Sequence, residues 1–396
     1  MRRRALLATC GAALSAGCAG WGPLGGPTGS GCELADGVPG DAAWTSARGG
    51  PRNTASSPAD RTPAPPFSIS WTFSIPGVTG TPVPTPAEGT VFTSDLDSGI
   101  FAIDAETGAE RWRASVSDPG AVAVADGTAF VAGEEGVLGF DAATGEKRWR
   151  AAVATTYDGS PVVADGTVYV PAGLSLVALD AATGAERWRY TTGLSTEAPP
   201  AVGDGTVFLG DGDAYVYALD AATGAEQWRF KTGGRVECAP ALAGETVYAG
   251  SRDGRVHALD AAAGRRRWSY ATDRGVESLT VGHGIVYAGT RERLHAVRRE
   301  SGARCWRSDR YVSQYSGGPA VGGGYVFAST DGGTGRRDFT DTRIGAFEAG
   351  TGELVWQFGP VDRQVDLGPA IADGALFSAG GGAGSLAVVR LDPKSG

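Results

Sequence analysis

The sequence is poor in the residues that build metal centres, disulfide frameworks and membrane spans. It has 3 His and 5 Cys in 396 residues, which argues against a multi-histidine metal centre and excludes a disulfide-rich scaffold. No segment is apolar over the roughly 20 residues that a transmembrane helix needs. Lysine occurs only three times, so arginine carries nearly all of the positive charge, and the net charge is -9. This acidic balance argues against a nucleic-acid partner, which requires a basic surface.

Glycine and tryptophan are in excess, at 63 and 10 residues, and both belong to one repeated phrase. It is clearest as Asp104, Gly108 and Trp112, with Thr before the Gly. It returns with Asp141 and Trp149, Asp180 and Trp188, Asp220 and Trp228, and Asp260 and Trp268; later copies around Trp306 and Trp356 lack the Asp. Trp71 has no such turn ahead of it, whereas the C-terminus carries a turn without its strand.

Each repeat of about 40 residues divides into four strand-like pieces separated by turn signals. In the third repeat these are residues 160–163, 167–170, 176–179 and 186–190. Four short strands per repeat are typical of a propeller blade, and eight tryptophans give eight blades. The predicted fold is therefore all-β, an eight-bladed β-propeller whose last blade takes its outer strand from the N-terminal side of the domain. That closure limits exposed sheet edges.

The residues of the repeat have structural explanations. The Asp carboxylate can accept hydrogen bonds from the turn amides, and the Gly supplies a positive φ. The Trp ring is expected to pack on the neighbouring blade. We therefore interpret the repeat as a folding motif and look for function among the residues that depart from it.

The repeated phrase resembles the tryptophan-docking motif of the PQQ-like β-propeller repeats, over roughly residues 67–396. The resemblance implies an eight-bladed propeller. The family includes quinone-dependent dehydrogenases, a lipid-anchored propeller that assists outer-membrane β-barrel assembly, and surface proteins. The layout is closest to the lipid-anchored group. The dehydrogenases use adjacent cysteines on the quinone and a Ca²⁺ ion, but no two cysteines are adjacent here.

The N-terminus has the pattern of an export signal. Three arginines, Arg2 to Arg4, precede a short apolar stretch that ends in small residues before Cys18. This pattern predicts a Tat-type lipoprotein signal over residues 1–17 and acylation of Cys18; cleavage without a lipid is the alternative. Residues 18–66 are rich in Gly and Pro and predict a tether, followed by the propeller over 67–396. The expected location is the outer face of the cytoplasmic membrane or the cell surface.

Acidic residues recur where the innermost strand of a blade begins. The predicted binding face comprises Asp158, Glu197, Glu237, Glu277 and Asp366, which would attract cations or a basic peptide at the channel mouth. A Ca²⁺ ion bridging these acids has no further support, and solvated loop acids are the alternative. An insertion adds Arg336 and Arg337, and a nearby loop adds Tyr315, residue types common in interfaces.

We find no catalytic motif, and the predicted role is a monomeric, non-enzymatic protein-binding scaffold without metal or cofactor. The alternative is a quinone- or sugar-dependent oxidoreductase. His257, His283 and His295 are expected to be structural, and residues 265–310 hold an excess of arginine that is a solvated sector or a contact for an acidic partner. Cys238 and Cys305 fall on inner and outer strands, too far apart to form a disulfide.

Overall fold

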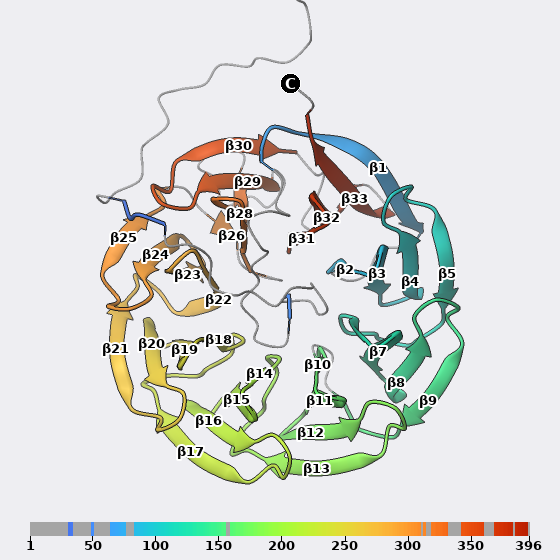
Figure 1. Ribbon diagram of the computed structural model, residues 1–396, viewed down its shortest axis with the longest axis horizontal. Coiled ribbons are helices and arrows are strands. Elements are labelled where there is room, and N and C mark those ends of the chain that lie inside the picture. Colours follow the sequence, from blue (N-terminus) through green and yellow to red (C-terminus); the bar gives the residue numbers. More distant parts are fainter. Residues whose placement is uncertain are drawn as a thin grey trace, which may run out of the picture.

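Eight antiparallel sheets surround a common centre (Figure 1). This computed structural model describes residues 31–34, 49–50, 64–76, 83–155, 159–309, 312–313, 318–331, 342–359, 368–382 and 385–394. Each sheet is one blade, with its first strand nearest the centre and its last strand on the rim. The eight-bladed propeller predicted from the tryptophan spacing is confirmed. Within the described residues, no helix is long and apolar enough to cross a membrane.

Blades 1 to 4 follow one another in sequence, and each has four strands. Blade 1 contains β2 (Thr85–Ala87), β3 (Thr90–Asp95), β4 (Gly99–Asp104) and β5 (Glu110–Ala114). Blade 2 contains β6 (Ala123–Ala125), β7 (Thr128–Gly133), β8 (Gly136–Asp141) and β9 (Lys147–Ala151). Blade 3 contains β10 (Val162–Ala164), β11 (Thr167–Ala172), β12 (Ser175–Asp180) and β13 (Glu186–Thr191). Blade 4 contains β14 (Ala201–Gly203), β15 (Thr206–Gly210), β16 (Tyr215–Asp220) and β17 (Glu226–Lys231).

The second half of the ring includes the two blades that depart from this plan. Blade 5 contains β18 (Ala241–Ala243), β19 (Thr246–Ser251), β20 (Arg255–Asp260) and β21 (Arg266–Ala271). Blade 6 contains β22 (Val276–Gly282), β23 (Ile285–Thr290), β24 (Leu294–Arg298) and β25 (Arg304–Arg307). Blade 7 contains β27 (Ala320–Gly322), β28 (Tyr325–Asp331), β29 (Thr342–Glu348) and β30 (Leu354–Phe358), with β26 (Val312–Ser313) as a fifth strand on β28. Blade 8 contains β31 (Ala370–Ala372), β32 (Ala375–Gly382), β33 (Ser385–Pro393) and β1 (Phe67–Pro76).

Blade 8 joins the two ends of the domain. Strand β1 pairs antiparallel with β33, and the register runs from Phe67 opposite Pro393 to Pro76 opposite Ser385. The predicted closure, with three strands from the C-terminal side and the outer strand from the N-terminal side, is confirmed. It places β1 on the rim of the sheet, where the other blades carry their Trp strand (Figure 1).

The middle strands of each blade form the core because neighbouring blades cover both of their faces. All six residues of β3, β11 and β19 are buried. Their sequences are accordingly almost continuous runs of apolar and small residues instead of an alternating pattern. The outer strands are more exposed: in β5, for example, only Trp112 is buried.

The Asp-to-Gly segment folds as a hydrogen-bonded turn, as expected from the sequence. Asp180 Oδ1 accepts hydrogen bonds from the backbone N–H of Ala182 at 3.1 Å and of Thr183 at 2.9 Å. Gly184 donates to the Asp180 carbonyl at 2.8 Å and has a φ of 73°. This is the left-handed region that glycine adopts without a Cβ penalty.

In seven of the eight blades, the tryptophan docks on the turn of the next blade. Trp188 Nε1 donates to the carbonyl of Ala221 at 2.9 Å, and its ring lies against Gly224. The same bond to the following blade is made by Trp71, Trp112, Trp149, Trp228, Trp268 and Trp306. Trp356 meets β1 through Phe67, with ring centroids 4.9 Å apart. These contacts agree with a structural role for the repeat.

The motif also includes an arginine, which was not predicted from the sequence. Arg187, directly before Trp188, pairs with Asp180 at 2.7 Å and donates to the Thr167 hydroxyl. The same pair joins Arg111 to Asp104, Arg148 to Asp141 and Arg267 to Asp260. The signal was present, because an arginine precedes the tryptophan in each of these four blades.

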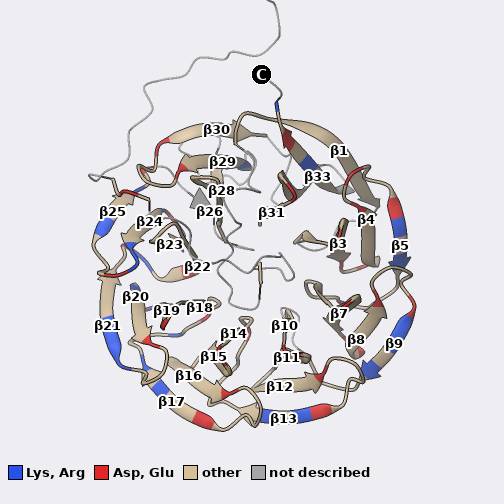
Figure 2. Cartoon of the chain, in the orientation of Figure 1, with Lys and Arg blue, Asp and Glu red and all other residues tan. Residues whose placement is uncertain are grey.

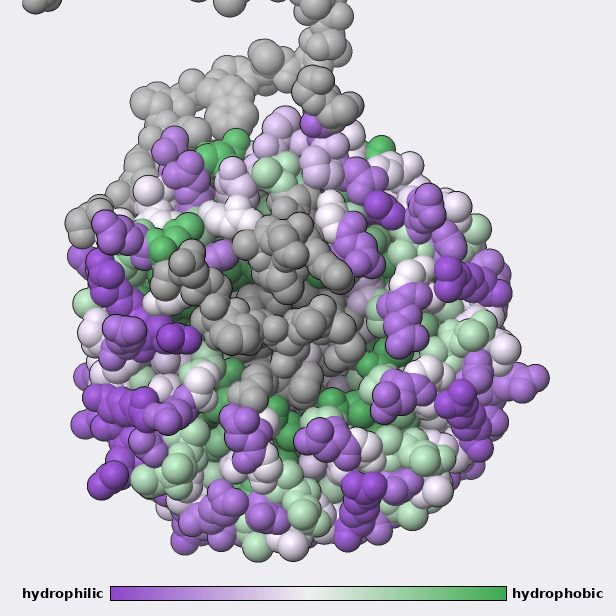
Figure 3. Space-filling view, viewed as in Figure 1, coloured by the Kyte–Doolittle hydropathy of each residue, from purple (hydrophilic) through white to green (hydrophobic). Residues whose placement is uncertain are grey.

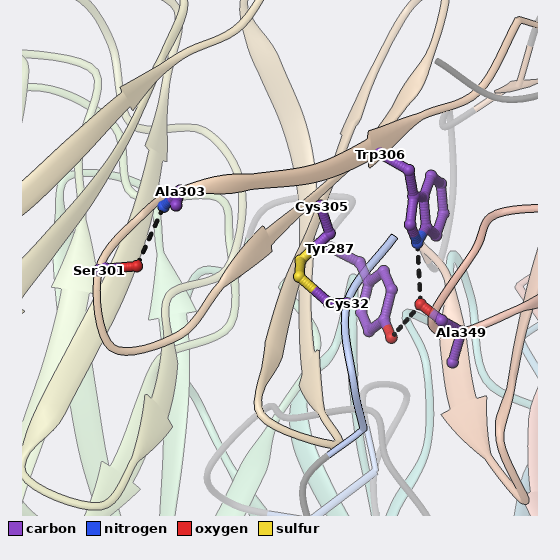
Figure 4. The surroundings of a disulfide bond; sticks show 7 residues. All are labelled: Cys32, Tyr287, Ser301, Ala303, Cys305, Trp306 and Ala349. Atoms are coloured by element: carbon purple, nitrogen blue, oxygen red, sulfur yellow. Dashed lines mark hydrogen bonds between the residues drawn. A yellow bond between two sulfur atoms is a disulfide. The ribbon is translucent and has the colours of Figure 1, made fainter. Parts of the chain in front are cut away.

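One disulfide joins the segment ahead of the propeller to blade 6 (Figure 4). Cys32 is bonded to Cys305 on β25, with 5.1 Å between the Cα atoms. The backbone reinforces the contact, because Gly31 N–H donates to the Cys305 carbonyl at 3.2 Å and Cys32 N–H donates to that of Gly350 at 2.8 Å. Cys238 is buried, and its thiol donates to the Gly250 carbonyl at 3.4 Å. Because Cys305 is bonded to Cys32, the expectation that Cys238 and Cys305 are not bonded to each other is confirmed. The partner of Cys305 was not foreseen.

Candidate binding face

One face of the propeller gathers two kinds of segment, and we call it the loop face. It carries the loops from the fourth strand of one blade to the first strand of the next, together with the turns between second and third strands. Backbone hydrogen bonds join the two kinds of segment: Thr196 N–H to the Gly173 carbonyl at 3.0 Å, and Arg252 N–H to the Arg235 carbonyl at 2.8 Å. Substitutions in either segment therefore alter the same surface.

The predicted acids of blades 4 to 6 lie on the loop face. Glu197 is exposed and accepts a hydrogen bond from Ser195 Oγ at 3.2 Å. Glu237 and Glu277 are partly buried. Asp158, Asp366, Tyr315, Arg336, Arg337 and Cys18 fall outside the described residues. The place of the insertion is as expected, between β28 and β29.

Glu237 and Glu277 are paired with arginines, which the sequence analysis did not foresee. Arg252 bridges them, at 2.6 Å from Glu237 Oε2 and 2.5 Å from Glu277 Oε1. Arg291 Nε reaches the same Glu277 oxygen at 2.8 Å, and Arg235 Nη1 lies 3.5 Å from Glu237 Oε1. The carboxylates of these two blades are therefore compensated by the protein itself. A count of acids along the sequence overlooks this because Arg252 and Arg291 lie in turns that the count leaves out.

Two exposed leucines lie in neighbouring segments of the loop face: Leu174 in the turn between β11 and β12, and Leu194 in the loop between β13 and β14. Leu174 and Leu194 are 52% and 45% exposed, and among the described residues they are two of five large apolar residues that are exposed. The Thr192 hydroxyl lies within hydrogen-bond distance of both carbonyls, at 2.9 Å from Leu174 and 2.6 Å from Leu194, and the Thr192 N–H donates to the Leu174 carbonyl at 2.8 Å. These contacts hold the two segments together. Leu194 also lies against Gly212 of blade 4. Apolar residues are visible on the molecular surface between hydrophilic ones in Figure 3.

Two histidines are buried beside carboxylates under the loop face. His257 Nε2 lies 3.0 Å from Asp253 Oδ2, and His295 Nε2 lies 2.9 Å from Asp273 Oδ1. Burial lowers the pKa of both imidazoles, against the opposing effect of the neighbouring carboxylates. Asp253 also accepts a bond from Gly233 N–H at 2.9 Å, so it orders the loop. These contacts agree with structural roles for His257 and His295.

The described residues do not fit a quinone site of the dehydrogenase kind. Their one disulfide joins cysteines 273 positions apart, at the outer strand of blade 6, whereas the sequence resemblance implies adjacent cysteines. In the same residues, no group of three or more His, Cys, Asp or Glu side chains is placed to hold a metal ion.

The sequence profile of the outer membrane protein assembly factor BamB matches residues 40–198 and 175–338. The chain belongs to this family. The match covers blades 1 to 6 in full and parts of blades 7 and 8, and it starts ahead of the propeller, so the resemblance found in the repeat is confirmed. A search of curated proteins finds no significant match.

Solved structures share the fold of this BamB family member at low identity. BamB from Moraxella catarrhalis superposes with a TM-score of 0.66 at 18% identity, covering 82% of this chain and 100% of the other. The quinohemoprotein alcohol dehydrogenase from Comamonas testosteroni gives 0.71 at 16%, covering 91% and 82%. The quinohemoprotein alcohol dehydrogenase ADHIIG from Pseudomonas putida HK5 gives 0.70 at 15%, covering 89% and 80%. At these sequence identities the similarity establishes the propeller fold, and the function has to be argued from the residues of the site.

Proposed function

We propose that this chain is an exported, lipid-anchored propeller that binds another protein through its loop face. The observation that carries the proposal is the exposed pair Leu174 and Leu194, held together by Thr192 and bordered by the exposed carboxylate of Glu197. Apolar side chains that remain in water next to polar ones favour a protein interface. The name of the matched family, an assembly factor for outer membrane proteins, supports a partner that is itself a protein.

Export and anchoring rest on the N-terminus and on the disulfide. The arginines, the apolar stretch and Cys18 supply the sequence pattern of a lipoprotein signal. The Cys32–Cys305 disulfide supports a location outside the reducing cytoplasm, because disulfides persist in oxidising compartments. The proposed domains are therefore the signal over residues 1–17, the tether over 18–66 and the propeller over 67–396.

A site-specific photocrosslinking experiment tests the proposal. A photoreactive residue at position 194 is expected to give one discrete protein adduct in intact cells, and the same residue at Val355 on β30 is expected to give none. The double variant L174S/L194S should lose the adduct when the crosslinker is moved to Glu197. The matched control is I69S/V355S, because Ile69 and Val355 are similarly exposed, at 51% and 42%, but lie on rim strands.

The results separate the protein-binding role from the alternatives. Equal adducts at positions 194 and 355, or an adduct that survives L174S/L194S, would overturn binding through the loop face. The oxidoreductase alternative is tested by adding pyrroloquinoline quinone to the purified protein. An absorbance shift together with a raised melting temperature would favour that alternative, and their absence would remove it.

A further inference from the structure

The loop face of blades 5 and 6 carries an alternating row of charges that we call the arginine ladder. It comprises Arg235, Glu237, Arg252, Glu277 and Arg291, in that order in space. The residues come from the loop before β18, the turn after β19, strand β22 and the turn after β23. Figure 2 shows basic and acidic segments next to one another in these two blades.

The glutamates hold the arginines in fixed positions. Glu277 is the firmest member, because its side chain is only 7% exposed and the same oxygen accepts bonds from Arg252 and Arg291. Arg252 is also fixed through its backbone, whose N–H donates to the Arg235 carbonyl at 2.8 Å. Guanidinium groups that are already ordered lose less entropy when they bind an anion.

The arginines at the two ends of the ladder have more exposed side chains than the central one. The side chains of Arg235 and Arg291 are 65% and 58% exposed, against 35% for the central Arg252. Arg235 contacts Glu237 through Nη1, and a guanidinium has five N–H donors. Three arginines and two glutamates leave one net positive charge on the ladder, within a chain of net charge -9.

We propose that the arginine ladder binds an acidic, extended segment of a protein partner, with its carboxylates on Arg235 and Arg291. This inference rests on the proposed protein-binding role of the loop face and adds the chemistry of the bound segment. Carboxylates match the planar donor edge of arginine in pairs of hydrogen bonds. Acidic side chains that are spaced along a peptide can contact the arginines at the two ends of the ladder and avoid Glu237 and Glu277.

A uniformly anionic surface fits the ladder less well. Membrane binding through charge uses clusters of about 4–8 basic residues, whereas here glutamates alternate with the arginines and would face the lipid phosphates. The same glutamates oppose a continuous phosphate backbone. The alternation therefore favours a segment with separated carboxylates over a lipid surface.

A binding assay with defined probes tests the inference on the folded, disulfide-bonded protein. The probe is a fluorescent peptide of alternating Glu and Ser, with a Gln-for-Glu peptide, vesicles of phosphatidylglycerol in phosphatidylcholine, and a single-stranded oligonucleotide as comparisons. Wild type is expected to prefer the Glu peptide, and R235Q/R291Q is expected to bind it at least 5-fold more weakly. Such a loss corresponds to about 1 kcal/mol, the size expected for two exposed charge contacts.

The matched control is R113Q/R229Q, on rim strands β5 and β17. Arg113 and Arg229 are 61% and 57% exposed, and each pairs with a glutamate three residues earlier. This control should bind the Glu peptide like wild type. Because Arg235 and Arg291 are exposed, R235Q/R291Q should keep the wild-type melting temperature within a few degrees. As a second measurement, the affinity of wild type should fall as salt rises from 50 to about 300 mM.

Three results would overturn the inference. The first is an equal loss of affinity for the Glu peptide in R235Q/R291Q and in the control, and the second is an affinity that does not depend on salt. The third is binding to the vesicles or the oligonucleotide that depends on the ladder and is stronger than binding to the peptide. The crosslinking assay distinguishes this failure from failure of the proposed function. An adduct at position 194 that persists while the Glu peptide does not bind would leave the protein-binding role standing and remove the ladder from it.

Discussion

Trp188 lies so close to Gly224 of the next blade that a Cβ atom on this glycine would stand 2.6 Å from the indole Cε3. The glycine also has a φ of 72°. Two independent constraints therefore select glycine at one position: the left-handed backbone and the approach of the ring. The sequence pattern indicated only the first of them.

The variant Gly224→Ala separates these two constraints. The left-handed backbone costs an alanine about 1–2 kcal/mol, and the clash with Trp188 is expected to add roughly 1–3 kcal/mol. The matched control is Gly205→Ala in the same blade. Its φ is also 72°, but nothing lies within 4 Å of the added Cβ. Urea unfolding should show a clearly larger loss for Gly224→Ala, and equal losses would contradict the docking role of this glycine.

The architecture was predictable because the residues that determine each blade lie within one repeat, and the repeat recurs along the chain. Each blade contains its own Asp turn, its Gly and its Trp, so the spacing of Trp112, Trp149 and Trp188 was sufficient to count blades. The resemblance to the assembly-factor family followed from the same residues. Even the arginine that pairs with Asp180 stands at a fixed position in the repeat.

The candidate site was less predictable because its contacts join different blades. Arg252 and Glu277 are 25 residues apart, and neither the turn nor the inner strand indicates the other as its partner. Cys32 lies outside the repeat and meets Cys305 only after the ring has closed. Such pairings depend on tertiary geometry, which a reading of local pattern and composition does not contain.

The Asp180 carboxylate predicts loss of stability in acid. Its hydrogen bonds with Arg187 and Thr183 lower its pKa from 3.8 to about 2. A lowered folded-state pKa means that the stabilisation is complete above pH 3.8 and is lost as the pH falls towards 2. Thermal melts from pH 5 to 2 should show this decline. The variant Arg187→Gln, which copies Gln227 of blade 4, should show a shallower decline, and an unchanged slope would contradict the assignment.

The Cys32–Cys305 disulfide is expected to stabilise the propeller. A native crosslink of this kind contributes about 2–5 kcal/mol, and this one closes a loop over 273 positions. The variant Cys32→Ser should therefore melt at a lower temperature than wild type. A reductant should lower the melting temperature of wild type and leave Cys32→Ser unchanged. Sensitivity of the variant to reductant would point to a second disulfide and would contradict the assignment of the effect to Cys32–Cys305.

His257 predicts a second pH dependence, near neutrality. Burial is the main cause that lowers its pKa from 6.5, and Arg266 and Arg255 act in the same direction against Asp253. Because the folded state disfavours the proton, stability should be complete above pH 6.5 and decline as the pH falls below it. The variant His257→Phe places at this position the residue that blade 1 has in Phe101. The urea midpoints measured at pH 7.5 and pH 5.5 should differ less in this variant than in wild type. His295 is expected to supply the difference that remains. An equal difference in both proteins would show that His257 does not titrate in this range.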